Sequence, residues 1–497
     1  MTNKILFWAD SLFIQFGIAK SLQEKYDYNL YAVYDLTHFL KNLLLEQKIV
    51  NFEKEWYFWD HVRMTKKTPD IKYLESFEKK FKINIWMFSN YEALFSKRNQ
   101  YHKFTHDEIL SIFEQECRFF EHILDEIKPN FLVIKFTDFH RNHLLKEMCN
   151  TLGIKVLMLT PTIVGNRSRI IHEYNIQHNT SKIEIKSENV KSFSELREYI
   201  KKYNKFLQAQ KIIAGGGKNS LIDKTKITLQ WAKTSEKEDM NRYDYYDATK
   251  SKVLVTRFLN GLRKKHRESF IDKNFEYDIN KDENFVYFPL QVEPERSLSI
   301  DAPFYVNQLE IIKNISKSLP VGYKLYVKEH FGQVFRNWRE IKYYKEIMDL
   351  PNVRLLHYSI KPEEIVSKCE LILSISGTTG FEAALYEKPS IIFADVNYEN
   401  LESVYRLRQI EDLPNVIRKA LKQKVNLLEL NKFIESIEMD SFSFDEIELQ
   451  NIIYAKFHNN GLSLKRDITL EEMQSFLQDQ KTIFDSLALE HIKKIKK

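Results

Sequence analysis

Cysteine is scarce in this sequence. Its three cysteines, Cys117, Cys149 and Cys369, are odd in number and far apart among 497 residues, which argues against a disulfide framework and against a zinc site. Glycine and proline are also few, at 12 and 11, and this favours helices and buried strands over long loops. No apolar run approaches the length of a transmembrane helix, and no secretory signal opens the chain. We therefore expect a cytoplasmic protein.

A strong excess of one charge sign is also missing. The 75 basic and 69 acidic residues leave a net charge of +6, which is too small to indicate nucleic-acid binding but is compatible with anionic substrates or a lipid surface. Four lysines lie in the terminal segment 491–497. We interpret this segment as a solvated tail, with peripheral contact to the inner membrane face as the alternative.

The chain is organised around the stretch Glu370–Asp395. Its pattern predicts an apolar strand over 371–375, a turn over 376–380, a helix over 381–386 and a second apolar strand over 390–394. Strands that are apolar throughout suit a parallel sheet covered on both faces. This stretch therefore predicts an α/β domain.

The turn in this stretch has features of a ligand site. Gly377 and Gly380 would let the backbone approach a ligand closely, and Thr378 and Thr379 add hydroxyl groups where a helix begins, a position that suits a phosphate. Glu382 lies in the first helical turn and could accept a hydrogen bond from a sugar or ribose hydroxyl. The alternative is an ordinary strand–turn–helix corner, because short glycine motifs are frequent.

The N-terminal half also places polar residues after predicted strands. Asp10 follows the first strand of a β-α-β unit, at the edge where open α/β sheets bind ligands, and it is either a general base or a turn-capping group. Asp138 and His140 follow a strand predicted over 131–135, and they are either site residues or capping and packing groups. Arg167 lies in a later loop and either reaches an anionic group or is solvated.

Three local patterns give further predictions. Thr105–Glu108 predicts a capping box that opens a long helix, and 83–88 predicts a third strand. Gly215–Gly217, followed by Lys218, suggests a phosphate loop, but the spacing does not fit and Asn219 replaces the required Ser or Thr. We therefore expect a flexible linker there.

The C-terminal half repeats the pattern of strands followed by polar residues. In a parallel sheet these residues face one crevice, which is how a nucleotide site is assembled. They are Gln291, Lys328, His330, Ser376 and Thr378. The strand ends carry no Asp-x-Asp pair, the arrangement that holds a cation against a diphosphate, so we expect metal-independent chemistry.

Three segments carry a family resemblance. FPLQVEPERSL (288–298), YVKEH (326–330) and SISGTTGFEAALYEKPSIIF (374–393) resemble the capsule polysaccharide synthesis proteins, which include the bacterial capsule Kdo transferases of the GT-B fold. The resemblance is strongest over about 284–400 and weaker in the N-terminal half. The last segment is also similar to that of the hydrolysing nucleotide-sugar 2-epimerases. Phe331 stands where the family usually has proline.

The resemblance implies a GT-B fold, with two Rossmann-like α/β domains whose parallel sheets face a central cleft. We expect an acceptor-side domain over 1–275 with a helical insertion at about 172–250, a nucleotide-sugar domain over 276–460, and a helical tail over 461–497. The residues implied to hold the donor phosphate and sugar are Lys328, His330, Ser376, Gly377, Thr378 and Thr379, with Gln291 and Glu382 placing the ribose, base or sugar.

The implied function is a glycosyltransferase that needs no cofactor or metal. It would move a sugar from a nucleotide-sugar donor to a surface glycan or glycolipid of the capsule or lipopolysaccharide type. The acceptor hydroxyl needs a base, for which we rank Asp138 and His140 ahead of Asp10, with Arg167 on the acceptor side. Two alternatives stay open: a nucleotide-sugar epimerase, and a non-catalytic GT-B scaffold that binds glycan or a partner enzyme.

Overall fold

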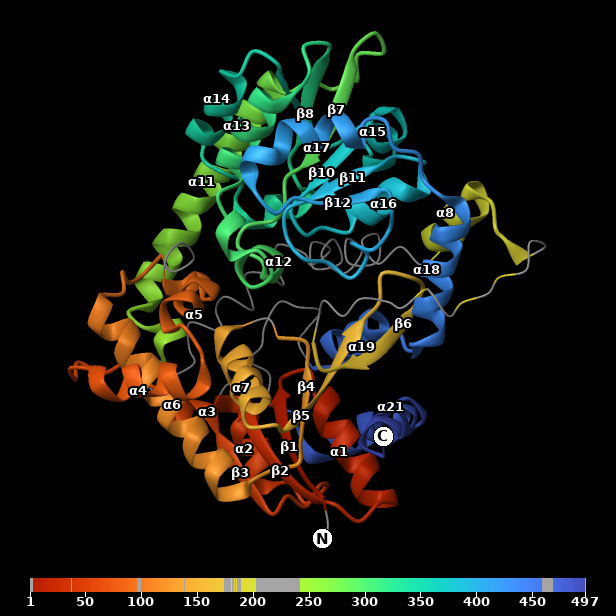
Figure 1. The fold of residues 1–497 in the computed structure, drawn as a ribbon. Helices are drawn as coiled ribbons and strands as arrows, with labels where there is room; N and C mark the ends of the chain where they lie inside the picture. Colours follow the sequence, from red (N-terminus) through yellow and green to blue (C-terminus); the bar gives the residue numbers. More distant parts are fainter. Residues whose placement is uncertain are drawn as a thin grey trace. The chain divides into compact units, whose positions relative to one another are not determined.

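The computed structural model forms two compact units (Figure 1). The first unit comprises Met1–Tyr174, Tyr203–Lys250 and Ser441–Lys497, and the second comprises Asn175–Lys202 and Ser251–Asp440. The residues that the structure describes are 3–36, 38–95, 100–137, 139–173, 180, 183, 185, 189–202, 242–457 and 468–496. The predicted linker at Gly215–Gly217 and most of the predicted insertion lie outside these residues.

The first unit is built on one mixed sheet in the order β13-β6-β5-β4-β1-β2-β3. Neighbours from β5 through to β3 run parallel, whereas β6 pairs antiparallel with both β5 and β13. The strands are β1 (Lys4–Asp10), β2 (Asn29–Asp35), β3 (Lys54–Tyr57), β4 (Phe131–Lys135), β5 (Lys155–Pro161), β6 (Arg167–Ile171) and β13 (Phe442–Ser443). The chain winds outward in opposite directions from β1 and β4, so the topological switch point lies between these two strands.

Side chains of β1 alternate between two covered faces of this sheet. Phe7 and Ala9 enter a core shared with the helices at the two ends of the chain. Trp8 points the other way and packs edge-on against Phe58 and Phe120, with ring centroids 5.7 and 5.9 Å away. The described helices of this unit are α1 (Ile14–Lys25), α2 (His38–Glu46), α3 (Phe58–His61), α4 (Ile71–Phe81), α5 (Ile85–Tyr91), α6 (His106–Ile127), α7 (His140–Thr151), α19 (Glu446–Phe457), α20 (Leu470–Asp479) and α21 (Lys481–Ile495), with short 3-10 turns at Ala93–Phe95 and Tyr243–Tyr245.

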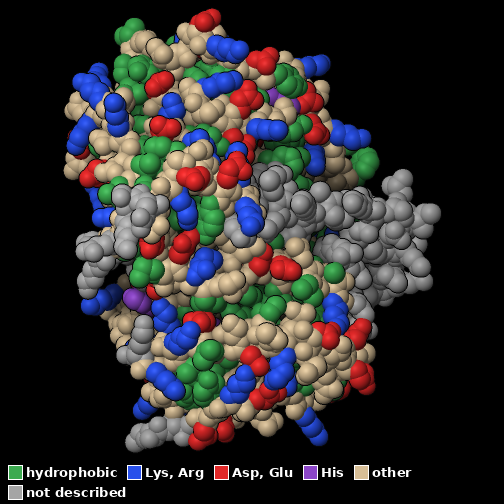
Figure 2. All heavy atoms as spheres, turned by 90° about the vertical axis from the view of Figure 1, so that its right-hand side faces the viewer, with side chains coloured by type: hydrophobic (Ala, Val, Ile, Leu, Met, Phe, Trp, Pro, Cys, Tyr) green, Lys and Arg blue, Asp and Glu red, His purple; other side chains and the backbone are tan. Residues whose placement is uncertain are grey.

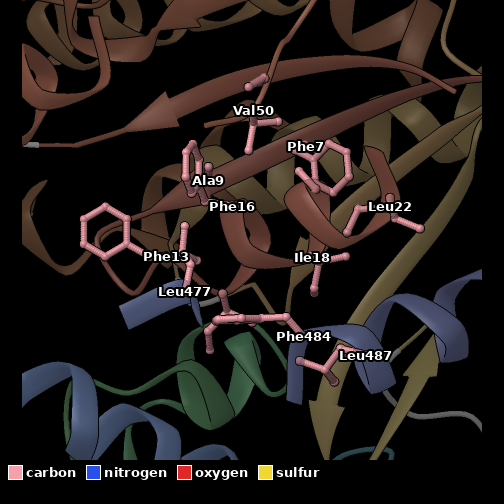
Figure 3. Close-up of a cluster of buried hydrophobic side chains, with 14 of the residues drawn as sticks. Phe7, Ala9, Phe13, Phe16, Ile18, Leu22, Val50, Leu477, Phe484 and Leu487 are labelled. Atoms are coloured by element: carbon pink, nitrogen blue, oxygen red, sulfur yellow. The ribbon is translucent and has the colours of Figure 1, made fainter. Parts of the chain in front are cut away.

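The C-terminal helices complete the core of the first unit. Figure 3 shows Phe484 and Leu487 of α21 lying with Phe16 and Ile18 of α1 in one apolar cluster. A Cβ added at Gly17 would lie 2.4 Å from the Phe484 ring, so only glycine permits this close approach of α1 and α21. The interpretation of 491–497 as a solvated tail is wrong for its described part, because α21 runs to Ile495 with one face packed against the core.

The second unit contains an all-parallel sheet in the order β12-β11-β10-β7-β8-β9. Its strands are β7 (Asn284–Pro289), β8 (Tyr323–Lys328), β9 (Val353–Leu356), β10 (Leu371–Ser374), β11 (Ser390–Ile392) and β12 (Val404–Arg406). Val286 and Phe288 of β7 enter one core, and Phe285 and Tyr287 enter another, so both faces of this sheet are buried. The switch point lies between β7 and β10.

The described helices of the second unit lie before, between and after its strands in the chain. They are α8 (Phe193–Lys202), α11 (Lys250–Asn274), α12 (Arg296–Ser299), α13 (Gln308–Ser318), α14 (Ile341–Met348), α15 (Pro362–Lys368), α16 (Thr379–Leu385), α17 (Leu413–Ala420) and α18 (Leu427–Met439), with 3-10 turns at Pro303–Tyr305, Phe331–Arg336 and Ile410–Asp412. Together the two strand orders confirm the predicted α/β fold class, with an all-parallel sheet in the second unit and parallel pairing from β5 to β3 in the first.

Two local predictions have opposite outcomes. The capping box at the start of α6 is confirmed: the Thr105 side chain accepts from the Glu108 N–H at 3.3 Å, and the Glu108 carboxylate accepts from the Thr105 N–H at 2.8 Å. The strand predicted over 83–88 is wrong. Asn84 caps a helix there by accepting from the Met87 N–H at 2.9 Å, and the third strand of the sheet is β3. A short apolar run fits either a strand or a buried helix, and here the cap selects the helix.

The two units differ from the predicted domain bounds. Helix α11 groups mainly with the second unit because Ile271 and the following Phe275 enter its core. Residues from Ser441 onward group with the first unit because β13 pairs with β6 and α19 to α21 enter the first core. The chain therefore crosses from the second unit back to the first near Asp440.

The described surface carries both charge signs. On the face drawn in Figure 2, Lys and Arg side chains are interspersed with Asp and Glu. None of the helices in the described parts of the chain combines the length and the apolar character needed to cross a membrane.

Candidate functional site

A cavity of about 670 Å³ lies at the switch point of the first unit. Its wall is formed by the residues at or just after the ends of β1, β2, β4 and β5, together with 242–245 and the start of α19, all of which belong to the first unit. Carboxyl ends of parallel strands meet at one edge of a sheet, and the crevice beside the switch point is where such sheets bind ligands. The cavity is thus the candidate ligand site of this unit.

Asp10 lines this cavity as the last residue of β1. One of its carboxylate oxygens accepts from the Leu12 N–H at 2.9 Å. Burial raises the pKa of Asp10, against the opposing effect of the Lys135 ammonium and the Leu12 N–H, and the carboxylates of Asp35 and Glu446 raise it further. A carboxyl group with a raised pKa in a cavity has the properties of a general base.

Lys135 and Glu446 form an ion pair beside Asp10. The Lys135 Nζ lies 2.9 Å from the Glu446 Oε1, and both side chains are largely buried. The Gln450 amide also donates to that oxygen, whereas the buried Oε2 of Glu446 has no hydrogen-bond partner among the described residues. The first residue of α19 therefore brings an unsatisfied acceptor to the cavity.

Four other charged residues of the cavity wall form two pairs. The Arg141 Nε donates to Asp35 at 2.7 Å, and Arg242 donates to both oxygens of Asp244 at 3.0 and 2.7 Å. The two guanidinium groups lie over the Trp59 ring, at 5.2 and 3.8 Å from its centroid. Sequence reasoning missed these residues, although Asp35 could have been found because it ends β2 in register with Asp10.

The remaining predicted residues of this unit lie elsewhere. His140 is fully buried: its Nδ1 lies 2.9 Å from a Glu92 oxygen, and its Nε2 lies 2.9 Å from a Glu116 oxygen. Burial alone would lower its pKa, but these two carboxylates raise the pKa of His140 to about 9. Both nitrogens are engaged and the ring does not line the cavity, so the structure does not favour His140 as the base. Asp138 lies outside the described residues.

Arg167 is held at the start of β6. Its Nε donates to the Ser441 hydroxyl at 2.7 Å and an Nη donates to the Ser441 carbonyl at 2.5 Å. These bonds join β6 to the segment that precedes β13. Arg167 is not among the residues that line the cavity.

In the second unit, Gln291 and Gly377 meet at the switch point between β7 and β10. A Cβ on Gly377 would lie 2.9 Å from the Gln291 Nε2, so the close packing requires glycine. The Gln291 amide nitrogen lies 3.4 Å from the Ser376 hydroxyl, which itself donates to the Ser297 carbonyl at 2.7 Å. The Oε1 of Gln291 is buried and has no hydrogen-bond partner in the described parts of the chain.

Lys328 ends β8 beside this switch point and is 5% exposed. Its ammonium group has no hydrogen-bond or ion-pair partner among the described residues. Burial lowers the pKa of Lys328 to about 8, although Glu329 and Glu363 oppose the shift. A buried cation without a partner is unstable unless an anion binds nearby, so Lys328 indicates an anion site.

His330 follows Lys328 at the same strand end. Its Nδ1 accepts from the Gly332 N–H at 3.0 Å, so the neutral ring carries its proton on Nε2 and can donate there. Burial, together with Lys328 and Arg339, lowers the pKa of His330 to about 4. The main chain is fixed by Glu329, which accepts from the His330 N–H at 2.7 Å and from the Tyr344 hydroxyl at 2.8 Å.

The turn that precedes α16 is bonded internally. The N–H groups of Phe381 and Glu382 both donate to the Thr378 carbonyl at 2.9 Å. The Thr378 hydroxyl donates to the Glu382 carboxylate at 3.0 Å, and burial raises the pKa of Glu382 against that hydrogen bond. Thr379 is the first residue of α16. The Glu382 carboxylate therefore already accepts one hydrogen bond, and this bond to Thr378 supports the shape of the turn.

Residues 224–401 match the family model described as capsule polysaccharide biosynthesis protein. This segment is about a third of the chain, and it is similar to that family. The family segment contains β7 to β11 and every residue predicted for the donor site, from Gln291 to Glu382. The predicted family resemblance is thereby confirmed. No curated protein matches the chain.

Several solved structures are similar to this chain at low identity. One is that of Thermosulfurimonas dismutans KpsC, beta Kdo 2,7 transferase, at 13% identity over 64% of this chain and 80% of that chain, with a TM-score of 0.32. Others are the UDP-GlcNAc 2-epimerase from Methanocaldococcus jannaschii, at 12% identity over 88% and 99% with a TM-score of 0.24, and the S. aureus MnaA-UDP co-structure, at 10% over 94% and 99% with a TM-score of 0.26. Similarities at these TM-scores do not bear on activity.

Proposed function

We propose that this protein is a glycosyltransferase of capsule polysaccharide synthesis. The second unit binds the nucleotide-sugar donor at the β7/β10 switch point, and the first unit binds a hydroxyl-bearing glycan or glycolipid in its cavity. The observation that carries the proposal is this cavity, with Asp10 in its wall. Transfer between two substrates needs a second ligand site, where a base acts on the acceptor. Epimerisation of one bound nucleotide sugar needs no such second site.

The chemistry requires a base on one substrate and stabilisation of the leaving group on the other. In the proposed reaction, the Asp10 carboxylate accepts the proton of the acceptor hydroxyl, whose oxygen bonds to the anomeric carbon. The bond from that carbon to the donor phosphate breaks, and the phosphate takes the negative charge. The Lys328 ammonium and the His330 Nε2–H are suited to stabilise that charge by hydrogen bonding.

The first test measures nucleotide binding. Nucleoside mono- and diphosphates are titrated into the full chain by calorimetry, and Lys328→Ala is expected to weaken the preferred nucleotide about ten- to a hundredfold, since charge-assisted bonds contribute about 1.5–3 kcal/mol. The matched control is Lys324→Ala, half-exposed on the same strand, which should bind normally. Normal binding by Lys328→Ala would place the donor elsewhere.

Chelator should leave turnover unchanged if the transfer is metal-independent.

The second test concerns the base. Asp10→Asn should bind nucleotide as the unchanged protein does, while transfer falls by about a hundredfold or more. The control is Asp125→Asn, an exposed aspartate of α6. Full transfer activity in Asp10→Asn would exclude it as the base. Sugar conversion without any acceptor would instead indicate an epimerase, and nucleotide binding with no turnover on any capsule-type acceptor would indicate a scaffold.

A further inference from the structure

Helix α11 exposes a stripe of large apolar side chains. These are Leu254, Val255, Phe258, Leu259 and Leu262, which are 46, 57, 68, 41 and 52% exposed. Their spacing of one, three and four residues places all five on one face of a helix. Exposed apolar residues scattered singly are ordinary on proteins, but a contiguous stripe marks an interaction surface.

The orientation of α11 follows from its buried residues. Val253 and Ile271 are buried, and each lies nine residues from Leu262. Nine residues are two and a half helical turns, so both buried side chains point about 180° away from Leu262. The Arg267 guanidinium further fixes the helix by donating to the carbonyls of Asn337 and Trp338 at 3.0 Å. The buried face of α11 thus lies opposite the apolar stripe on the helix.

The part of this helix that carries the stripe has charges of one sign, whereas Glu268 and Asp272 follow nearer its end. Residues 250–267 contain seven Lys and Arg residues and no Asp or Glu: Lys250, Lys252, Arg257, Arg263, Lys264, Lys265 and Arg267. This differs from the face in Figure 2, where the two signs are interspersed. An apolar stripe bordered by cations is the pattern of a helix that lies in the interface of a membrane.

We propose that α11 binds the surface of an anionic lipid bilayer, with the apolar stripe among the acyl chains and the flanking cations at the headgroup phosphates. Charge complementarity selects this occupant. A second copy of the chain would oppose Arg263, Lys264 and Lys265 with the same three cations, whereas anionic headgroups supply the opposite sign. Nucleic acid would supply the charge but would leave the apolar side chains in water. The proposal does not depend on the proposed function.

The test is flotation of the full chain with lipid vesicles. The protein should float with vesicles of phosphatidylglycerol and phosphatidylcholine, should not float with phosphatidylcholine alone, and should detach as salt is raised. Phe258→Gln with Leu262→Gln should weaken binding at least tenfold, because it removes two of the apolar groups that enter the bilayer. The matched control is Phe304→Gln, since Phe304 is 82% exposed in the second unit outside α11 and should not contribute.

A charge variant covers the case in which the apolar variant does not fold, as judged by circular dichroism. Arg263→Glu with Lys264→Glu and Lys265→Glu keeps the stripe and should weaken binding to the anionic vesicles at least a hundredfold. The proposal is overturned if the unchanged protein does not float, if the folded variants float as it does, or if binding ignores phosphatidylglycerol. It is also overturned if the apolar variant only abolishes a dimer seen by sedimentation, since the stripe would then cover a second copy.

Discussion

Lys135 interacts with two carboxyl groups of the first cavity, those of Asp10 and Glu446. Its positive charge lowers the pKa of Asp10 and so opposes the effect of burial. Lys135→Met should therefore raise the pKa of Asp10 further and move the acid limb of the pH–rate profile to higher pH. Asp35 and Glu446 also face Asp10, and their charges would act in the same direction once the cation is gone.

The measurement is the transfer rate against pH for Lys135→Met and for Lys155→Met, an exposed lysine at the start of β5. Only the first variant should shift the acid limb. An unchanged profile in Lys135→Met would show that Asp10 does not set that limb.

Lys328 makes nucleotide binding dependent on pH. In the free protein the pKa of Lys328 is lowered to about 8, and a bound phosphate would raise it by charge attraction. Affinity should be constant below pH 8 and should fall above it, by up to about tenfold per pH unit, because binding then takes up a proton. Calorimetry between pH 7 and pH 10 measures this. Lys328→Met should abolish the dependence and Lys324→Met should retain it, whereas a flat profile in the unchanged protein would contradict the assignment.

His140 joins three elements of the first unit: it begins α7, contacts Glu116 of α6 and contacts Glu92 just before a 3-10 turn. The pKa of His140 is about 9 in the folded protein and about 6.5 in the unfolded chain. The charged ring therefore stabilises the fold fully below pH 6.5, and this stabilisation is lost as the pH rises through 9. His140→Gln leaves two buried carboxylates without their cation, so we expect a loss of about 3–5 kcal/mol in the free energy of unfolding.

Urea unfolding at pH 6 and at pH 9.5 measures this contribution. The deficit of His140→Gln relative to the unchanged protein should shrink at the higher pH. The control is His122→Gln, since His122 is an exposed histidine of α6. This variant should not change the free energy of unfolding at either pH. An equal deficit for His140→Gln at both pH values would mean that the ring is not charged.

The contact between α1 and α21 depends on Gly17. Gly17→Ala would place a methyl group against the buried Phe484 ring, so it should destabilise the protein by about 1–3 kcal/mol through overpacking. The matched control is Gly261→Ala, because a Cβ there meets nothing within 4 Å, and it should stabilise the protein slightly. Chemical denaturation measures both. Combining Gly17→Ala with Phe484→Leu should recover part of the loss, and no recovery would point to a cause other than this contact.

At the scale of the whole molecule, the sequence predicted what depends on local pattern. Apolar strands followed by polar residues located β1, β4, β7, β8 and β10, and hence the two edges where Asp10 and Lys328 lie. The contacts of Glu446 with Lys135 could not be predicted, because they join segments far apart in the chain and no short-range pattern encodes them. The enclosure of the His140 ring by Glu92 and Glu116 could not be predicted either, because sequence spacing does not show which side chains surround it. The role of Asp138 stays a prediction.

The return of the chain to the first unit at Ser441 has a consequence for its synthesis on the ribosome. The strands of the second unit lie within 284–406 and are complete well before the chain ends, whereas the first core still lacks α19 to α21. The half of the protein that is translated first is therefore the last to close its apolar core. A nascent chain arrested after Asp440 would carry a finished second sheet and an open first one, with Phe13 and Phe16 lacking the aromatic and aliphatic partners that the final helices bring.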